Sequence, residues 1–214
     1  MVSDISLFMS QYFQIHPQNP QVRLINQAVD IIRNGGVIVY PTDSVYAIGC
    51  HLNDKKALDR IKLIRNLSGK HNFTLMCRDL SEIATYAKVN NPKYRLLKSL
   101  TPGPYTFILP ATKEVPARLQ HSKKKTIGIR VPDCQITLDI LQALNEPLMS
   151  VTVILPNVST PLYDAKEIYR CLDAQVDLVI DGGPCEMEYT SIIDLTSDLP
   201  LVIRAGKGDV SLFS

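Results

Sequence analysis

The sequence lacks a long apolar run and any paired arrangement of cysteines. No stretch approaches the roughly 18 to 20 apolar residues that span a bilayer, and the segment from Met1 to Ser10 does not have the pattern of a signal peptide. The five cysteines are odd in number, widely spaced and without a Cys-x-x-Cys pair, which argues against a disulfide framework and a zinc site. We therefore expect a soluble cytoplasmic protein with reduced thiols, no bound metal and no membrane partner.

Several motifs of nucleotide-binding and hydrolytic proteins are also absent. The sequence has no Walker A loop, no Rossmann glycine triplet and no Gly-x-Ser-x-Gly elbow, and its four histidines have no spacing that indicates a triad or a metal site. The net charge is only +2, so a basic surface has to come from local clusters such as Lys123 to Lys125. The simpler interpretation of that run is a solvated loop before a strand.

The 214 residues have an ordinary globular composition without a linker, a repeat or a low-complexity tract, so we expect one domain over residues 1–214. Apolar spacing predicts helices that alternate with short strands rich in β-branched residues. Asn91 is expected to cap the fourth helix, with proline next to it. Helices are predicted at 20–34, 54–66, 80–87, 92–100, 136–144 and 165–174, and strands at 37–40, 73–77, 105–109, 126–131, 148–153, 178–180, 191–195 and 201–204. This alternation predicts an α/β fold, or α+β in stricter terms, with a mixed sheet covered by helices.

Polar or glycine-rich segments lie at the ends of several predicted strands, at 41–46, 101–106, 129–132, 181–183 and 203–206. Strand ends form the crevice that binds ligands in open α/β sheets, so the segments predict one composite site. Each segment also has a purely structural interpretation, because Pro41 to Ser44 can form a turn and Arg130 or Arg204 can be a surface charge.

In their order and spacing, these segments resemble the YrdC/YciO family, over about residues 15–206. The similarity includes the segments Pro41-Thr42-Asp43-Ser44-Val45-Tyr46, Pro102-Gly103-Pro104-Tyr105-Thr106, Ile127-Gly128-Ile129-Arg130-Val131-Pro132 and Ile203-Arg204-Ala205-Gly206. The segment His71 to Leu80 resembles the YciO-like branch more than the authentic synthases. The resemblance implies the family's YrdC-like three-layer fold with a twisted mixed sheet. It also implies the activity of an L-threonylcarbamoyladenylate synthase, which joins threonine, bicarbonate and ATP into the donor for a tRNA modification.

The resemblance further implies two groups of site residues and their ligands. Planar, always charged arginines suit the phosphate and carboxylate groups that this chemistry requires. The ligands are ATP or another adenylate, as a substrate that can carry Mg²⁺, together with L-threonine or a related amino acid and bicarbonate. The nucleotide-binding residues are Arg65, Asn72, Ser150, Thr152 and Arg204, and the substrate-binding residues are Thr42, Ser44, Tyr46, Arg130 and Ser191. We expect Arg65, Arg130 and Arg204 to converge, with the hydroxyls of Thr42 and Ser150 nearby.

The sequence departs from the synthase pattern at two polar positions. The family's Lys-x-Arg pair becomes Leu63-Ile64-Arg65, and its Ser-x-Asn pair falls on Thr152 and Ile154. A phosphate-binding cation and an amide are therefore missing, which favours a weak or altered synthase with no catalytic residue assigned. The alternatives are a protein that binds another adenylate without chemistry, and a non-catalytic module for double-stranded RNA or tRNA. That RNA surface would use Arg65 with Lys62, Lys70, Arg78, Lys123, Lys124 and Lys125.

Overall fold

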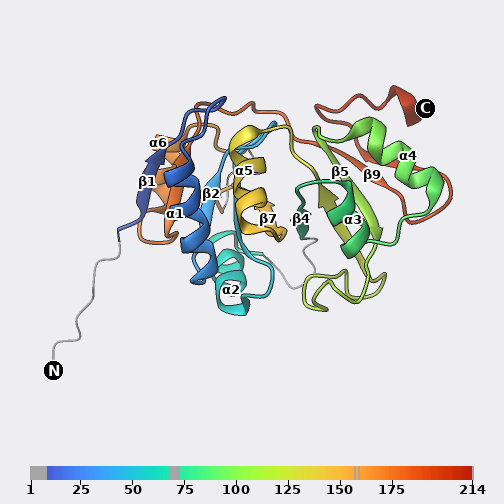
Figure 1. Ribbon diagram of the computed structural model, residues 1–214, viewed down its shortest axis with the longest axis horizontal. Helices are drawn as coiled ribbons and strands as arrows, with labels where there is room; N and C mark the ends of the chain where they lie inside the picture. Colours follow the sequence, from blue (N-terminus) through green and yellow to red (C-terminus); the bar gives the residue numbers. More distant parts are fainter. Residues whose placement is uncertain (1–8, 68–72, 157, 159, 214) are drawn as a thin grey trace.

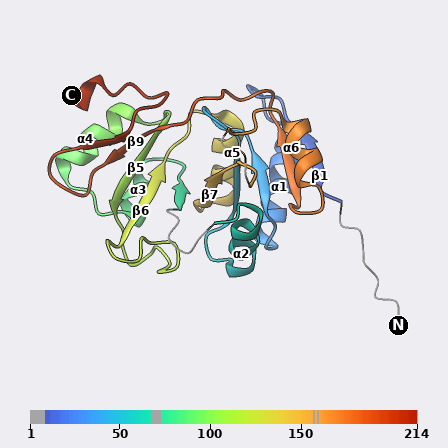
Figure 2. The same cartoon turned by 180° about the vertical axis from the view of Figure 1, so that it is seen from behind.

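The computed structural model describes residues 9–67, 73–156, 158 and 160–213. Its strands form one ten-stranded mixed sheet in the order β1-β8-β2-β3-β7-β4-β6-β5-β9-β10, with helices on both faces (Figures 1 and 2). The strands are β1 Gln11–Gln14, β2 Ile38–Tyr40, β3 Ala47–His51, β4 Thr74–Met76, β5 Tyr105–Pro110, β6 Thr126–Arg130, β7 Leu148–Thr152, β8 Leu178–Asp181, β9 Ser191–Asp194 and β10 Leu201–Arg204. The helices are α1 Val22–Arg33, α2 Lys55–Ile64, α3 Leu80–Tyr86, α4 Asn91–Leu100, α5 Gln135–Leu144 and α6 Ala165–Leu172, followed by a 3-10 turn at Ser211–Phe213. The predicted α/β fold with a mixed sheet is confirmed.

Two apolar clusters hold the helices against the sheet. On one face, α1 and α5 pack on β2 and β8 through residues such as Ile32, Ile140 and Leu178, all of them fully buried. The larger cluster joins α2, α3, α4 and α6 to the other side of the strands. Burial of each large apolar side chain stabilises the folded state by about 1.5–3 kcal/mol. The two clusters therefore hold the helices and strands in their positions.

Side chains alternate along β4, β5 and β6, and one face of these strands has no helix packed on it in the part of the chain that the structure describes. Leu75, Phe107 and Ile129 point into the larger apolar cluster with α3 and α4, so the residues between them point to the opposite face. Figures 1 and 2 show α3 and α4 on one side of β5 and β6, with the other side of these strands turned toward the viewer in Figure 2. The open face carries Thr74, Thr106, Gly128 and Arg130, which are polar or small.

The structure differs from the predicted elements in a few places. Two strands, β1 and β3, were not predicted. The cap of α4 is Asn90, whose side chain accepts from the Lys93 amide at 3.0 Å, so the prediction of Asn91 as cap was wrong by one residue. The predicted helix 165–174 stops at Leu172, and Ala174 has a left-handed φ of 62°. Within the described part of the chain, no helix has the length and apolarity needed to cross a membrane.

Candidate functional site

A cavity of about 420 Å³ opens on the helix-free face of the sheet. Arg65, Arg130 and Arg204 line it, and so do the hydroxyl-bearing side chains of Ser150 and Thr152. The described lining residues include no carboxylate. These predicted residues come from distant parts of the chain, and the sheet brings them to one place. Among the described residues, Arg65 and Arg204 have no carboxylate partner, and a cavity lined by these charges favours ligands that are negatively charged.

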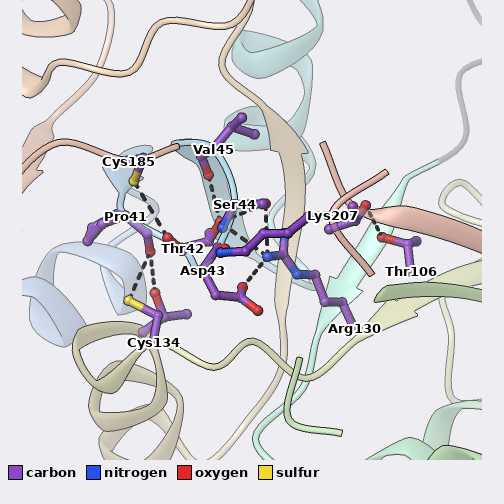
Figure 3. A network of polar contacts seen from close by, with 12 residues as sticks. Pro41, Thr42, Asp43, Ser44, Val45, Thr106, Arg130, Cys134, Cys185 and Lys207 are labelled. Atoms are coloured by element: carbon purple, nitrogen blue, oxygen red, sulfur yellow. Dashed lines mark hydrogen bonds and ion pairs between the residues drawn. The ribbon is translucent and has the colours of Figure 1, made fainter. Parts of the chain in front are cut away.

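Arg130 is fixed by the Pro41–Val45 segment in the polar network of Figure 3. Its side chain is 7% exposed and forms an ion pair with Asp43. The same nitrogen, Nη2, donates to Thr42 Oγ1 at 3.2 Å and to Ser44 Oγ at 3.0 Å. Neither Thr42 nor Ser44 is among the residues that line the cavity. The structure therefore places both predicted hydroxyls against Arg130, where they orient it, and their contact with substrate stays a prediction.

Two groups in this network were not recognised in the sequence. Asp43 is as buried as Arg130, and its Oδ2 has no hydrogen-bond partner among the described residues. Lys207 Nζ donates to the Asp43 carbonyl at 2.6 Å (Figure 3). The same nitrogen donates to Glu186 Oε1 at 2.8 Å. The sequence shows Asp43 as a polar residue within the Pro-Thr-Asp-Ser segment. Only the tertiary structure shows that its carboxylate faces an arginine.

Arg65 and Arg204 form the other cationic walls of the cavity. Arg65 follows the last residue of α2 and donates to the Ile154 carbonyl, while its Nε is buried without a hydrogen-bond partner among the described residues. Arg204 donates through Nε and Nη2 to the Thr190 carbonyl at 3.1 and 2.8 Å, and its guanidinium lies 4.9 Å from the centre of the Tyr189 ring. Burial lowers the pKa of both guanidinium groups. Arginine stays charged despite such shifts, and a charge with little water around it attracts anions more strongly.

Ser150 is oriented by the neighbouring strand β2. The Tyr40 hydroxyl donates to Ser150 Oγ at 2.7 Å, and burial raises the pKa of Tyr40, so this phenol remains a donor. The proton of Ser150 is therefore free to point toward a ligand in the cavity.

Two other predicted substrate residues have backbone partners. The Tyr46 hydroxyl donates to the Gly183 carbonyl at 2.7 Å, and Ser191 Oγ donates to the Gly208 carbonyl at 2.5 Å while accepting from the Gly206 amide at 2.9 Å. Neither residue is among those that line the cavity. They hold the loops around the site in place, and a substrate contact by either one is untested.

Two thiols flank the Pro41–Thr42 backbone. The Cys134 thiol donates to the Pro41 carbonyl at 3.6 Å and the Cys185 thiol to the Thr42 carbonyl at 3.5 Å (Figure 3). Burial raises the pKa of Cys185 to about 12 and also raises that of Cys134. Both sulfurs are therefore neutral thiols at physiological pH, and neither is activated as a nucleophile.

The predicted RNA-binding residues lie on separate segments. Lys62 Nζ contacts Asp59 at 3.2 Å on the surface of α2, and Arg78 pairs with Asp79 before α3 beside a different cavity. Lys123, Lys124 and Lys125 are exposed in the β5–β6 connection. The remaining predicted residues, Lys70 and Asn72, lie outside the described residues. Over the described ranges, no group of three or more His, Cys, Asp or Glu side chains is placed to hold a metal ion.

Comparisons with known proteins give consistent results. The family model Sua5_yciO_yrdC, described as "Telomere recombination", matches residues 30–206. YciO of Escherichia coli is 57% identical, with 96% of this chain and 100% of that protein covered, and its crystal structure matches with a TM-score of 0.93. A Buchnera aphidicola protein named threonylcarbamoyl-AMP synthase is 28% identical over 77% of this chain and 95% of its own. The crystal structure of P. abyssi Sua5 complexed with L-threonine shares the fold, with a TM-score of 0.85, 22% identity, and coverage of 92% of this chain and 58% of that one.

Proposed function

The chain belongs to the Sua5/YciO/YrdC family, and on that premise we propose that its cationic cavity binds ATP and an amino acid as a diverged threonylcarbamoyl-AMP synthase. The observation that carries the proposal is the convergence of Arg65, Arg130 and Arg204 on a cavity whose described lining has no carboxylate. The name of the Buchnera relative supports the reaction, and the Sua5 complex with L-threonine supports an amino acid as one substrate.

The proposed reaction is an adenylyl transfer onto an N-carboxylated amino acid. A carbamate oxygen attacks the α-phosphorus of ATP, the new P–O bond forms, and the bond to pyrophosphate breaks. Arg65 and Arg204 hold the phosphates and stabilise the charge that develops on the leaving pyrophosphate, while Arg130 binds a carboxylate. Ser150 donates its free proton to a ligand oxygen. Because the described lining offers no carboxylate, it does not fit a protein-bound Mg²⁺, and the ion belongs to the nucleotide substrate in this proposal.

The substitutions at two positions support a weak or altered activity. Ile154 lines the cavity beside Arg65, where it offers no side-chain hydrogen bond. Leu63 is 81% exposed on α2 and carries no charge. The loss of one cation and one amide costs roughly 10² to 10⁴ in rate on the usual scale of such contacts. We therefore expect turnover well below that of a synthase with both groups.

A pyrophosphate-release assay with ATP, threonine and bicarbonate tests the proposal. We expect slow release that requires all three substrates, and a loss of at least about tenfold on Arg65→Gln because a phosphate contact disappears. The matched control is Arg95→Gln, which removes an exposed arginine of α4 and should leave the rate unchanged. If pyrophosphate is never released with any amino acid, and the protein instead binds double-stranded RNA with strong salt dependence, the RNA-binding alternative is correct.

A further inference from the structure

Lys207 follows β10 beside the cationic cavity, although it is not among the described residues that line it. Its backbone is tied to the wall that carries Arg204, and its ammonium group is tied to the wall that carries Arg130. We propose that Lys207 is a positioning residue, which fixes the Arg130 wall relative to the Arg204 wall. This inference rests on the proposed function, because there Arg130 binds the N-carboxylated amino acid and Arg204 binds the phosphates of ATP.

The backbone of Lys207 lies against the start of β9. Its amide donates to the Tyr189 carbonyl at 2.9 Å, and the amide of Gly206 donates to Ser191 Oγ at 2.9 Å. A Cβ atom at Gly206 would lie 2.3 Å from the Tyr189 carbonyl, so the close approach of the two segments requires this glycine. Arg204, three residues earlier, is held by the same part of the chain. The backbone of Lys207 is therefore fixed relative to Arg204.

The ammonium group of Lys207 reaches the segment that orients Arg130 (Figure 3). Nζ donates to the Asp43 carbonyl at 2.6 Å, whereas the carboxylate of the same Asp43 forms the ion pair with Arg130. Asp43 is therefore held from two sides, through its main chain by Lys207 and through its side chain by β6. Hydrogen bonds from a charged donor are roughly twice as strong as neutral ones, so the contact with the carbonyl is an effective anchor.

Glu186 keeps the ammonium group in this position. Its Oε1 accepts from Lys207 Nζ at 2.8 Å, and it comes from a third segment, the connection between β8 and β9. The carboxylates of Asp43 and Glu186 balance the charges of Arg130 and Lys207. A lysine stem loses much rotamer freedom when its end is held, and two acceptors on one nitrogen offset that cost. The side chain of Lys207 is only 29% exposed, which agrees with a fixed position.

Ligands that need both walls depend on the spacing that Lys207 sets. In the proposed transfer, the reacting atoms have to approach to about 3–3.5 Å, and a misplacement of about 1 Å can cost about a hundredfold in rate. A ligand that contacts one wall alone needs only one arginine in place. We therefore expect Lys207 to matter for the reaction step and much less for the affinity of either substrate.

Steady-state kinetics of pyrophosphate release test this expectation. Lys207→Met removes the ammonium group and keeps the length of the side chain, so kcat should fall about ten- to a hundredfold. The KM values for ATP and threonine should stay within about threefold of the parent values, because the lost interaction acts on the reaction step. Lys207→Arg keeps a charged donor and should restore most of the lost rate. The matched control is Lys98→Met, which changes an exposed lysine of α4 and should retain the parent kcat.

Hydrogen exchange measures the positioning without turnover. The Ser44 amide donates to Thr42 Oγ1 at 3.1 Å within the segment that Lys207 anchors. Its exchange should become about tenfold faster in Lys207→Met, the effect of one charge-assisted hydrogen bond, while amides of β7 keep the parent rate. Glu186→Gln changes only an exposed side chain and should show the same pattern to a smaller extent, so it serves as the test variant if Lys207→Met does not fold.

The possible outcomes separate this inference from the proposed function. If the parent is active and Lys207→Met has the parent kcat, or if the exchange of the Ser44 amide does not change, the inference is wrong and the proposed function stands. If the parent releases no pyrophosphate with any amino acid, the proposed function falls, and the exchange rate of Ser44 decides whether Lys207 positions the Arg130 wall. A lower kcat together with faster exchange at Ser44, both reversed by Lys207→Arg, supports the inference.

Discussion

At the scale of single residues, the Arg130–Asp43 ion pair is the contact on which the site depends most. Both side chains are 7% exposed, and Asp43 Oδ2 and Arg130 Nε have no hydrogen-bond partner among the described residues. Two buried charges of opposite sign are tolerable together and costly apart. The pair therefore keeps the Arg130 charge in the cavity wall, and removal of either side chain would leave the other charge buried without a counterion.

Replacing Arg130 by leucine should lower the free energy of unfolding by about 3–5 kcal/mol, because the Asp43 carboxylate is left buried without a counterion. Urea unfolding measures the change. The double variant Arg130→Leu/Asp43→Asn should regain a large part of the loss, since it removes the second charge as well. Equal stabilities of the parent and the Arg130→Leu variant would show that Asp43 does not need the ion pair.

Restoring the two missing polar groups should strengthen nucleotide binding. Leu63 is 81% exposed, so Leu63→Lys needs no burial of charge, and Ile154→Asn introduces an amide into the cavity beside Arg65. We expect the double variant to bind ATP about tenfold more tightly or to release pyrophosphate faster, and to exceed the sum of the single variants if both groups contact one nucleotide. Calorimetric titration and thermal melts measure affinity and folding. A folded double variant with the parent affinity would mean that these positions do not reach the nucleotide.

The sequence identified Arg130 and Arg204 because their segments lie at strand ends, whereas Arg65, which follows α2, was identified only through the family resemblance. It did not identify Asp43 and Lys207 as parts of the site. Asp43 stands in a segment that can form an ordinary turn, and Lys207 lies far from it in the sequence. Their contacts depend on the packing of that segment against β6 and the residues after β10, which no local pattern indicates.

At the scale of elements, the cap of α3 couples helix stability to pH. Burial alone would raise the pKa of Asp79, but hydrogen bonds from the Ser81 hydroxyl, the Glu82 amide and the Arg78 side chain outweigh it and lower the pKa to about 2. A carboxylate with a lowered pKa in the folded state contributes stability above its unfolded pKa of about 3.9 and loses it as the pH falls toward 2.

Asp79→Asn should therefore be less stable than the parent at pH 7 by under about 1 kcal/mol, since the charge is partly exposed and screened. The difference should stay constant from pH 7 to 5 and shrink between about pH 4 and 2, where the parent also becomes neutral. Urea unfolding across this range measures it, with Asp198→Asn as the exposed control. A difference that does not change with pH would mean that the charge of Asp79 contributes nothing.

The two strands that sequence patterns missed have identifiable reasons. β1 contains glutamines at both ends and only half-buried aromatic residues, because it is an edge strand beside β8. In β3 the four residues Ala47 to Cys50 are all buried, so polar and apolar residues do not alternate, and Gly49 interrupts the run. A Cβ atom at Gly49 would lie 2.7 Å from the Met149 carbonyl, so the close approach of β7 requires this glycine. Both strands depend on packing against neighbouring strands. The local spacing of apolar residues in the sequence does not indicate that packing.

At the scale of the whole molecule, one sheet connects all the parts that contribute to the site. The cavity includes Ser150 from β7, Arg130 from β6 and Arg204 from β10, strands that span six of the ten positions in the sheet order. A ligand in the cavity would contact residues from several of these strands at once. It would therefore stabilise the arrangement of the strands and not only one local segment.

ATP should accordingly stabilise the entire fold in a single unfolding transition. A ligand at about a hundred times its dissociation constant adds about 2.7 kcal/mol to the free energy of unfolding. For a chain of this size, each kcal/mol raises the melting temperature by about 2–4 °C, so we expect a shift of about 5–11 °C. Arg65→Gln should reduce the shift at the same ATP concentration, whereas Arg95→Gln should retain it, because only the first of these arginines lines the cavity. Differential scanning calorimetry measures the shift and the number of transitions. Two transitions, of which ATP moves only one, would show that the sheet unfolds in two units and that the cavity belongs to one of them.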